Sequence, residues 1–522
     1  MGLGRQTFKH TAIYSIATII GKLAGFLMLP FYAHIFQAEG YGIIAMIDTS
    51  LGFLTVLLSG GFSTAILRIY HEQDAGRKGL VLSTGIQMVW VLGVLIIALP
   101  LIFSAPLSRV VLGNSDYYPL FCLSLITFVI DVAGQSASTY LIIGQRSLLF
   151  SFIGILRMFI GLFLNIWLII ILQVGLIGVF ISSLATAAIC SAAFHLAAFR
   201  DHGLRFDKQI AADLLKFQLP LIPGDIISFM GRQAERVMVR INIGLAGVGV
   251  LEMAYMFPPL LNIFITIPFT RAWRTKSIEI AEQVDAPRII GRMFTQYLFL
   301  LVFAGLIMGV TIQSIIELAT PEDFWPAVRI AHIEIFTVIL AACTTYLNFG
   351  IFYRKQTKVI SYVKTTLTPV KIGLAFLMIS AWGLSGAAYS ALVIEGVTLA
   401  WITYKAQKMY PIPLEQTKIL TIVAGAMGIF LMLEGNRYAD FAPAMYAKAH
   451  FFPGLETFLL STPLGEWKHG RLVQMIHEKQ DLFITLFLNA LFSLSFLAML
   501  PLVWRKGQGS GDEVRKPELS QP

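Results

Sequence analysis

Long apolar runs, separated by short breaks rich in charged and turn-forming residues, fill most of the chain. Each run is close to the roughly 20 residues that an α-helix needs to cross the hydrocarbon core of a bilayer. We therefore predict an all-α, polytopic membrane protein with about 14 transmembrane helices. Their approximate boundaries are residues 11–36, 41–66, 80–104, 118–143, 149–172, 176–199, 217–241, 248–270, 293–312, 326–349, 359–381, 384–403, 419–433 and 482–504.

The seventh run, 217–241, is unusually charged, because it contains Asp225, Arg232, Glu235, Arg236 and Arg240. Each charge at the centre of a membrane helix costs about 2.5–3.5 kcal/mol on insertion scales, so hydropathy alone does not establish this helix. The distribution of basic residues supports it. With all 14 helices in place, 25 of the 39 Lys and Arg residues lie in segments on the N-terminal side of the membrane and 6 on the other side. Positive segments face the cytoplasm, so we predict that both termini are cytoplasmic.

Composition agrees with this pattern. Hydrophobic residues make up 57% and charged residues 13% of the 522 positions, whereas soluble domains carry about 25% charged residues. The longest stretch without a predicted helix, 434–481, is shorter than an independent domain of roughly 100–150 residues. A soluble enzyme, a nucleic-acid-binding protein and a disulfide-stapled secreted module are therefore excluded, and we predict no enzymatic activity.

The cysteines give no sign of a metal site or a disulfide framework. Cys122, Cys190 and Cys343 lie far apart in separate apolar runs, which is typical of small buried side chains. The histidines within the predicted helices form no ligand cluster either. We predict neither a bound metal nor another cofactor.

The chain contains an internal repeat. Residues 40–46 (GYGIIAM) open the second predicted helix, and residues 247–253 (GVGVLEM) open the eighth, 207 residues later. Both copies follow an odd-numbered helix, so the repeat is parallel, as in transporters whose two lobes move about a central site. The alternative is a chance match, because glycine and aliphatic residues are common in membrane helices.

This repeat divides the chain into two six-helix lobes around a central cavity, followed by a helix pair. The predicted segments are an N-terminal lobe at 8–200, a cytoplasmic linker at 201–216, a C-terminal lobe at 217–404, an extra helix pair at 417–504 with an outer loop at 434–481, and a disordered cytoplasmic tail at 505–522.

Polar residues form stripes along several of the predicted helices, at the spacing that brings side chains onto one helical face. Ionisable side chains at membrane depth face a bundle interior or an aqueous cavity by default. The alternative is that they pair with one another and fix helix contacts. The stripes are Ser15, Thr18 and Lys22; Asp48, Thr55 and Ser59; Asp131, Gln135 and Ser138; Asp225, Arg232 and Arg236; and Lys364, Thr368 and Lys371.

The basic members of these stripes suit an anionic substrate. Arginine can bond two phosphate oxygens at once, while lysine acts as a point charge. We predict that a diphosphate is bound by Lys22, Arg232, Arg236, Lys364 and Lys371.

Two carboxylates of the first lobe are candidates for ion coupling. Asp48 and Asp131 lie on polar stripes, where a bound proton or Na⁺ would bias the conformational equilibrium. Alternatively, each neutralises a nearby base such as Lys22 or Arg157. On the fifth predicted helix, Arg157 is flanked by a stripe of Gly154, Gly161 and Asn165, where we expect another helix to approach closely.

Several of these motifs resemble those of a known family. They are the Gly40-Tyr41-Gly42 turn, the segment 219–223 (LPLIP) at the start of the seventh helix, the Glu235-Arg236 pair within it, and Gly247-Val248-Gly249 after it. Over residues 8–410 the chain resembles the polysaccharide biosynthesis proteins, which are O-antigen and lipid-linked oligosaccharide flippases of the multidrug/oligosaccharidyl-lipid/polysaccharide exporter superfamily. Family members commonly have Asp-Arg in place of Glu235-Arg236, which is a conservative difference.

The resemblance implies a flippase that moves a polyprenyl-diphosphate-linked oligosaccharide across the cytoplasmic (inner) membrane by alternating access, for the synthesis of surface polysaccharide. Its implied partners are the lipid-linked glycan, membrane lipid, and the polysaccharide polymerase and assembly proteins, with no nucleic acid. The last two predicted helices lie outside the matching part, and in related lipid II flippases an extra helix pair forms a groove for the lipid tail.

Two rival functions remain open. A membrane-embedded polysaccharide polymerase or ligase would also have many helices and a long outer loop with basic residues and histidines, but it needs no duplicated lobes. A cation-coupled multidrug exporter shares the superfamily fold. The carboxylate expected on the first helix of such an exporter is absent, because Lys22 stands in that helix instead.

Overall fold

The computed structural model describes residues 2–59, 62–74, 76–281, 283–438 and 493–504, with only the backbone described at 2–24, 27, 202, 275, 430–438, 502 and 504. Every regular element in these ranges is helical. The expected tail at 505–522 and nearly all of the expected outer loop lie outside the described residues. Only the first five residues of that loop segment are described, and they are helical, because α18 (Gln416–Tyr438) continues through them.

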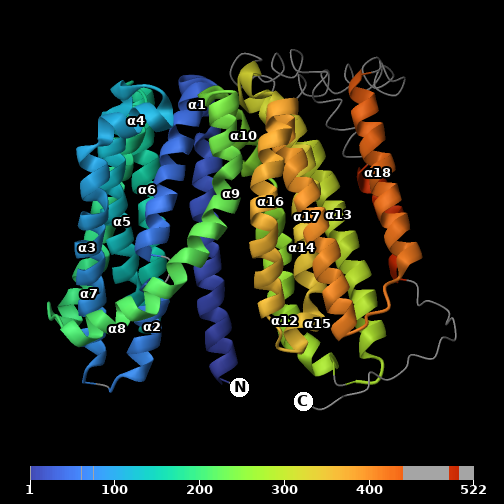
Figure 1. Cartoon of the computed structure of the whole chain (residues 1–522), viewed down its shortest axis with the longest axis horizontal. Coiled ribbons are helices and arrows are strands. Elements are labelled where there is room, and N and C mark those ends of the chain that lie inside the picture. The colour runs from blue at the N-terminus through green and yellow to red at the C-terminus, as the bar shows by residue number, and fades with distance from the viewer. Residues whose placement is uncertain (1, 60–61, 75, 282, 439–492, 505–522) are drawn as a thin grey trace, which may run out of the picture. The chain divides into compact units, whose positions relative to one another are not determined.

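The chain divides into two units, each with its own dense packing. Unit 1 consists of Met1–Glu252, Ala319–Asp323 and Ile372–Leu384, and unit 2 of Met253–Leu318, Phe324–Lys371 and Ser385–Pro522. Within each unit the long helices run side by side (Figure 1). The helices of residues 2–252 are α1 (Gly2–Ser59), α2 (Phe62–Glu72), α3 (Lys78–Ile102), α4 (Ser104–Leu112), α5 (Tyr118–Ile143), α6 (Ser147–Asn165), α7 (Ile177–His202), α8 (Lys208–Gln218), α9 (Ile222–Asn242) and α10 (Leu245–Met256), which ends in unit 2.

The remaining described residues form further long helices and several short ones. A π-helical turn at Asn262–Thr266 joins α11 and α12, as another at Ile166–Ile171 extends α6. The other helices are α11 (Pro259–Leu261), α12 (Ile267–Ala281), α13 (Ala286–Ala319), α14 (Pro326–Leu347), α15 (Phe349–Tyr353), α16 (Lys358–Trp382), α17 (Leu384–Met409), α18 and α23 (Leu500–Trp504).

The predicted all-α membrane class is confirmed, whereas the count of fourteen helices is not. Ten described segments are long and apolar enough to span a bilayer. The first two predicted helices are joined in α1, which breaks at Gln37, where φ is 53°. The charges of α9 keep it out of the ten. The part of α18 whose side chains are described, Gln416–Ile429, is apolar but too short to be counted, and most of the last predicted helix lies outside the described residues.

The backbone repeats its unusual conformations at the same spacing as the sequence motif. Gln37 and Gly244, 207 residues apart, both have positive φ, of 53° and 110°. Gln145 and Lys355, 210 residues apart, have φ of 52° and 58°, in the turns that follow α5 and α15. Non-glycine residues rarely adopt this region, so its recurrence after equivalent helices supports the parallel repeat.

The glycines of the repeated motif pack against each other within unit 1. A Cβ atom on Gly42 would overlap the backbone carbonyl of Leu245, and one on Gly249 would overlap the carbonyl of Ala38. The two contacts are related by the repeat, since Ala38 and Leu245 are also 207 residues apart. Glycine is required here because the backbones of α1 and α10 approach too closely for any side chain.

The linker segment predicted at 201–216 contains the amphipathic helix α8. Ile210, Ala211 and Leu214 are buried in the core of unit 1. The Asp207 side chain accepts hydrogen bonds from the backbone N–H groups of Gln209 and Ile210 at 2.8 and 3.1 Å and so caps the helix.

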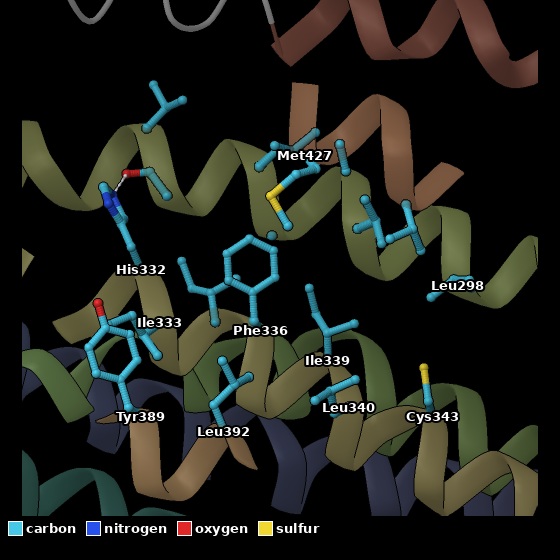
Figure 2. Close-up of a pocket in the computed structure, with 18 of the residues that line it drawn as sticks. Leu298, His332, Ile333, Phe336, Ile339, Leu340, Cys343, Tyr389, Leu392 and Met427 are labelled. Carbon is cyan, nitrogen blue, oxygen red and sulfur yellow. Dashed lines mark hydrogen bonds between the residues drawn. The ribbon is translucent and has the colours of Figure 1, made fainter. Parts of the chain in front are cut away.

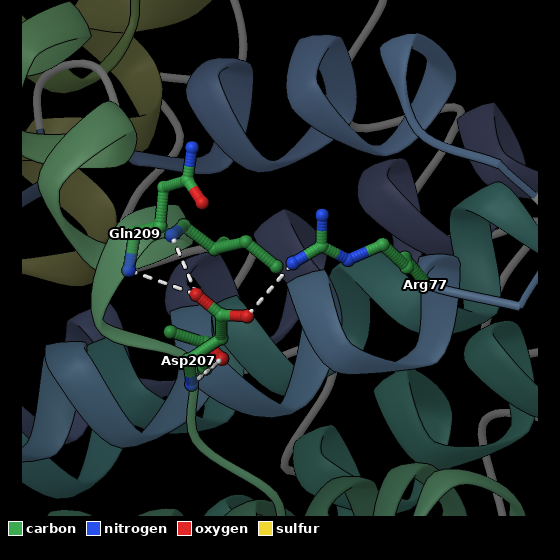
Figure 3. A network of polar contacts seen from close by, with 5 residues as sticks. Arg77, Asp207 and Gln209 are labelled. Carbon is green, nitrogen blue, oxygen red and sulfur yellow. Dashed lines mark hydrogen bonds and ion pairs between the residues drawn. The ribbon is translucent and has the colours of Figure 1, made fainter.

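Figure 3 shows this cap together with the Arg77 guanidinium, which lies 3.0 Å from the Asp207 carboxylate. The preceding backbone is held by α3, because Thr84 accepts a hydrogen bond from the Asp207 amide and Ser83 accepts one from Arg205. Helix α8 is therefore fixed to unit 1.

Unit 2 contains a stack of aromatic rings where α12, α13 and α14 meet. Phe269 and Tyr297 stack with centroids 4.2 Å apart, and Trp273 and Tyr346 with centroids 5.0 Å apart. The Tyr346 hydroxyl donates a hydrogen bond to the Ile290 carbonyl at 2.9 Å. Each ring adds buried apolar area and a specific geometry, so the stack ties three helices together.

Candidate functional site

The charged helix α9 lies beside α1 in unit 1 (Figure 1). Its charged residues have different environments. Arg236 is about one-fifth exposed and forms an ion pair with Glu252 of α10 through both Nε and Nη2. Its Nη1 donates a hydrogen bond to Gln233 at 2.5 Å. This two-pronged geometry is the strong form of an Arg–carboxylate pair.

Two further groups lie near this pair. Asp48 of α1 is close enough to Glu252 and Arg236 to interact with both electrostatically, and Tyr41 is close enough to interact with Glu252. One arginine therefore lies among two carboxylates and a phenol, all within unit 1.

Arg232 differs from Arg236, one helical turn away. It is exposed, and it makes no hydrogen bond or ion pair with any residue that the structure describes. Arg240 has a structural partner, because its Nε donates to the Val111 carbonyl at the end of α4, at 3.1 Å. Of the three arginines on α9, Arg232 is thus the one that presents an unpaired guanidinium.

The remaining predicted diphosphate ligands lie on α1 and α16. Lys22 is in the helical backbone of α1, within the part whose side chains are not described. Lys364 is exposed and Lys371 half-buried on α16 of unit 2. Both lysines act electrostatically on the Glu395 carboxyl of α17, whose Oε1 accepts a hydrogen bond from Thr344 at 3.4 Å.

The structure thus brings Arg232 and Arg236 together on one helix and the two lysines together around Glu395. Convergence of all five on one diphosphate stays a prediction. Glu252 and Glu395 accompany these bases, and the sequence did not predict these partners, because helical spacing does not tell which helices are neighbours.

Asp131 is engaged by two partners. Its Oδ1 lies 2.5 Å from Arg157 Nη1, and its Oδ2 accepts a hydrogen bond from Gln135 at 3.0 Å. The expectation that Asp131 neutralises Arg157 therefore agrees with the geometry. Whether an ion also binds there stays a prediction.

This ion pair borders a polar pocket of about 370 Å³ within unit 1. Helices α1, α5, α6 and α7 form its walls, with side chains that include Tyr32, Asn165, Ser182 and Thr186. Asn165 Oδ1 accepts hydrogen bonds from the hydroxyls of Tyr32 and Ser182, at 2.7 and 2.9 Å. We call this the polar pocket.

The expectation of a close helix contact is wrong at Gly154, whereas at Gly161 the neighbouring helix α7 comes within ordinary van der Waals distance. A Cβ atom on Gly154 would have no neighbour within 4 Å, and one on Gly161 would have only Thr186, at 3.7 Å or more. Both glycines line the polar pocket. The stripe leaves space for a cavity. Small residues on a helix face allow either a close helix contact or a cavity, and their spacing in the sequence does not distinguish the two.

A second pocket, of about 640 Å³, lies within unit 2 between α13, α14, α17 and α18. Its walls are almost entirely aliphatic and aromatic, and Figure 2 shows Phe336 of α14 and Met427 of α18 pointing toward one another. His332 is held at one end by a 2.9 Å hydrogen bond to the Gly309 carbonyl. We call this the apolar pocket.

Helix α18 has a partner in the last described segment. A Cβ atom on Gly425 would overlap the Met499 side chain, and Phe496 stacks on Phe299 of α13 with centroids 5.1 Å apart. In the part of the chain that the structure describes, no three His, Cys, Asp or Glu side chains are grouped as metal ligands.

Comparison with known proteins identifies the family. The sequence model of the family described as polysaccharide biosynthesis protein matches residues 7–274, about half of the chain. A curated relative, Lsg locus protein 1 of Haemophilus influenzae, is 28% identical over 92 residues. That match spans 18% of this chain and about a quarter (23%) of the relative.

Solved structures share the fold. The lipid II flippase MurJ in an inward closed conformation is similar with a TM-score of 0.68 at 14% identity, over 94% of this chain and 99% of that chain. An inward-facing multidrug resistance MATE family transporter of the MOP superfamily gives a TM-score of 0.56 at 16% identity, over 75% and 94%. At these identities the likeness shows the fold alone, which is that of a multi-pass membrane transporter.

Proposed function

Because the chain belongs to the polysaccharide biosynthesis protein family, we propose that it is a flippase. Its substrate is a polyprenyl-diphosphate-linked oligosaccharide, moved across the cytoplasmic membrane by alternating access for the synthesis of cell-surface polysaccharide. Both termini and the segment from Arg271 to Arg292 face the cytoplasm, and the 434–481 loop faces outward.

The observation that carries the proposal is Arg232. A guanidinium at membrane depth is expensive, and such residues are functional by default. Arg232 is exposed and has no partner among the described residues, so it is available to an anionic group. A diphosphate supplies the matching oxygens, because the planar guanidinium bonds two of them.

Arg236 has a different part in this proposal. Its guanidinium is held by Glu252, so it contributes to the diphosphate only if the substrate displaces that carboxylate. Such an exchange would link substrate binding to the contact between α9 and α10. Lys22, Lys364 and Lys371 complete the proposed set.

The apolar pocket is suited to the lipid part of the proposed substrate. Its lining is aliphatic and aromatic, and α18, which closes one side, belongs to the extra helix pair. A polyprenyl chain in the bilayer is already surrounded by hydrocarbon, so it can exchange lipid contacts for these apolar walls at little cost in free energy. A soluble sugar would gain nothing from such walls.

The test is an export assay in cells lacking the protein and in cells carrying variants. Loss of the protein should cause polyprenyl-linked oligosaccharide to accumulate on the inner side of the membrane. Arg232→Ala should export at least tenfold less at normal membrane abundance, and Arg232→Lys should be intermediate because it keeps the charge without the fork.

Arg109→Ala is the matched control, since Arg109 is also exposed but lies on the short helix α4 and not on the charged helix α9. If the deletion strain accumulates no lipid-linked sugar, the flippase proposal fails. If Arg232→Ala exports as well as Arg109→Ala, the diphosphate role of Arg232 fails.

Topology has its own test. A cysteine at position 448 should react with an impermeant thiol reagent in intact cells, and one at position 276 should not. The reverse pattern would overturn the proposed orientation.

Ion coupling remains a proposal for Asp48 and Asp131. A coupling ion at Asp131 has to compete with Arg157, whereas Asp48 has acidic Glu252 as well as Arg236 nearby. Asp48→Asn and Asp131→Asn should change how export depends on the ion gradient, and unchanged dependence in both would exclude them.

A further inference from the structure

The polar pocket of unit 1 differs from what a diphosphate site or a lipid-tail site would need. Eight of the fourteen residues that line it have hydrogen-bonding side chains, and it lies within the unit between four helices. Its volume of about 370 Å³ is at the lower end of the roughly 300–1,000 Å³ found for small-molecule pockets. It has room for a small polar group and not for a whole lipid-linked glycan.

The charges in the pocket cancel. Arg157 and Asp131 are paired at 2.5 Å, and the second carboxylate oxygen is occupied by Gln135. A cation would have to displace Arg157, and an anion would have to displace Asp131. A neutral ligand leaves this pair intact, so the pocket favours a ligand without charge.

Hydrogen-bonding capacity remains after the internal bonds are counted. Thr186 is only 6% exposed, and its hydroxyl has no partner among the described residues. Arg157 uses one of its five N–H donors in the ion pair, and no other bond of its side chain is found within the described chain. A buried hydroxyl without a partner is costly, so the pocket is built for a ligand that supplies one.

The glycines provide the space. A Cβ atom on Gly25 or Gly154 would meet nothing within 4 Å, and both residues line the pocket. Side chains at these two positions would extend into the cavity. The space in the cavity therefore depends on glycines of two different helices, α1 and α6.

From these features we infer that the polar pocket binds one neutral sugar ring. A sugar offers hydroxyl groups that both donate and accept, which matches the Thr186 hydroxyl, the spare Arg157 donors and the lone pairs of Tyr32. It carries no charge that would disturb the Arg157–Asp131 pair. This inference rests on the proposed function, in which the ring belongs to the transported glycan, and it assigns that glycan a binding site in unit 1.

Binding of free sugars to the purified full-length protein in nanodiscs tests the inference directly. Glucose, galactose and N-acetylglucosamine serve as probes, with saturation-transfer NMR as the readout and titration for the dissociation constant. Wild-type protein should bind at least one of them. Gly154→Leu, which fills the cavity, should weaken that binding at least tenfold, and Thr186→Val, which removes one hydroxyl at nearly constant shape, should weaken it about threefold to tenfold.

Gly373→Leu is the matched control, because a Cβ atom there also meets nothing within 4 Å, on a helix that does not line the pocket. It should bind like the wild type. Absence of binding by wild-type protein, or equal binding by wild type and Thr186→Val, overturns the inference.

Export measured in the same variants separates this inference from the proposed function. If the deletion strain accumulates lipid-linked sugar but sugar binding is absent, the flippase role stands and the sugar site is wrong. If sugars bind and Gly154→Leu abolishes binding while the deletion strain accumulates nothing, the site stands and the flippase role is wrong.

Discussion

The two pockets have opposite chemistry although the chain is built from a repeat. The polar pocket of unit 1 contains the paired Asp131 and Arg157 and several hydroxyls. The apolar pocket of unit 2 is lined by side chains such as Phe336, Ile339 and Leu340. Positions 207–210 residues after Asp131 are Val338–Ala341, so the place of the carboxylate in one repeat is taken by aliphatic residues in the other.

The backbone features, by contrast, are shared. Positive φ recurs at Gln37 and Gly244 and again at Gln145 and Lys355, and the glycine packing of Gly42 is mirrored by that of Gly249. Helix turns and close crossings depend on backbone geometry, which few residues can satisfy. Pocket walls tolerate any side chain of suitable size, so the lining is free to differ, and it is polar in one pocket and apolar in the other.

The largest expected effect comes from breaking the ion pair of α9 and α10. Arg236→Ala leaves the Glu252 carboxylate, about one-fifth exposed, without its partner, at a cost of about 3–5 kcal/mol. Membrane abundance and the apparent melting temperature in detergent should both fall. Arg232→Ala is the matched control on the same helix, and its abundance should stay normal because no partner is lost.

Export separates a structural role of Arg236 from a substrate role. If Arg236 only pairs with Glu252, export of Arg236→Ala and Arg236→Lys should fall in proportion to abundance. Failed export at normal abundance would assign Arg236 to the substrate. Removing the orphaned charge as well, in Arg236→Ala with Glu252→Gln, should restore part of the abundance.

The next largest effect is expected where Gly42 of α1 and Gly249 of α10 pack together. Gly42→Ala or Gly249→Ala places a methyl group against a backbone carbonyl that cannot rotate away, which should cost about 1–3 kcal/mol by overpacking. The apparent melting temperature of each purified variant provides the measurement. Gly224→Ala is the control, because a methyl group there meets nothing within 4 Å. If Gly42→Ala and Gly249→Ala were both as stable as the wild type, α1 and α10 would be shown to move apart without cost.

Sequence reasoning located this repeat but not the contact it makes. The spacing of GYGIIAM and GVGVLEM placed both copies at the start of equivalent helices, and the fold confirms the helical class. Periodicity identifies which residues share a helix face, but it gives neither the rotation of a helix nor its neighbour. For that reason the partner of Arg236 on α10 and the cavity beside Gly154 and Gly161 appeared only in three dimensions.

One missed element did carry a local signal. Residues 201–216 were expected to form a linker, yet Asp207 is followed by Ile210, Ala211 and Leu214, the pattern of an N-cap and an amphipathic helix. Short helices of this kind are stable only when they pack. The core of unit 1 supplies that packing. The sequence of the segment indicates an amphipathic helix, but it does not indicate which surface the helix packs against.

A smaller effect, on export and not on stability, is expected from filling the apolar pocket. Val423 of α18 lines it and is 44% exposed, so Val423→Trp should occupy the volume without straining the fold. Export of lipid-linked sugar should fall about threefold to tenfold at normal abundance if the pocket holds the lipid tail. Leu420→Trp is the control, since Leu420 is on the same helix but not in the pocket. Equal export by the two variants would show that the lipid tail does not bind in this pocket.

The smallest effect is expected at the cap of α8, which belongs to neither pocket. The Asp207 carboxylate accepts hydrogen bonds from the Ile210 and Gln209 amides and pairs with Arg77, and these interactions lower its pKa below the ordinary value of 3.8. Because the folded pKa is lowered, its contribution to stability is present at neutral pH and is lost as the pH falls through that lowered value.

Asp207→Ala, which loses both the cap and the ion pair, should lower the apparent melting temperature at pH 7 by about 1–2 °C. Asp207→Asn should fall between Ala and wild type, because its amide oxygen still caps the helix but carries no charge for Arg77. Sugar binding and export should not change in either variant. A loss of export with Asp207→Asn at normal abundance would show that α8 takes part in transport and is not merely fixed to unit 1.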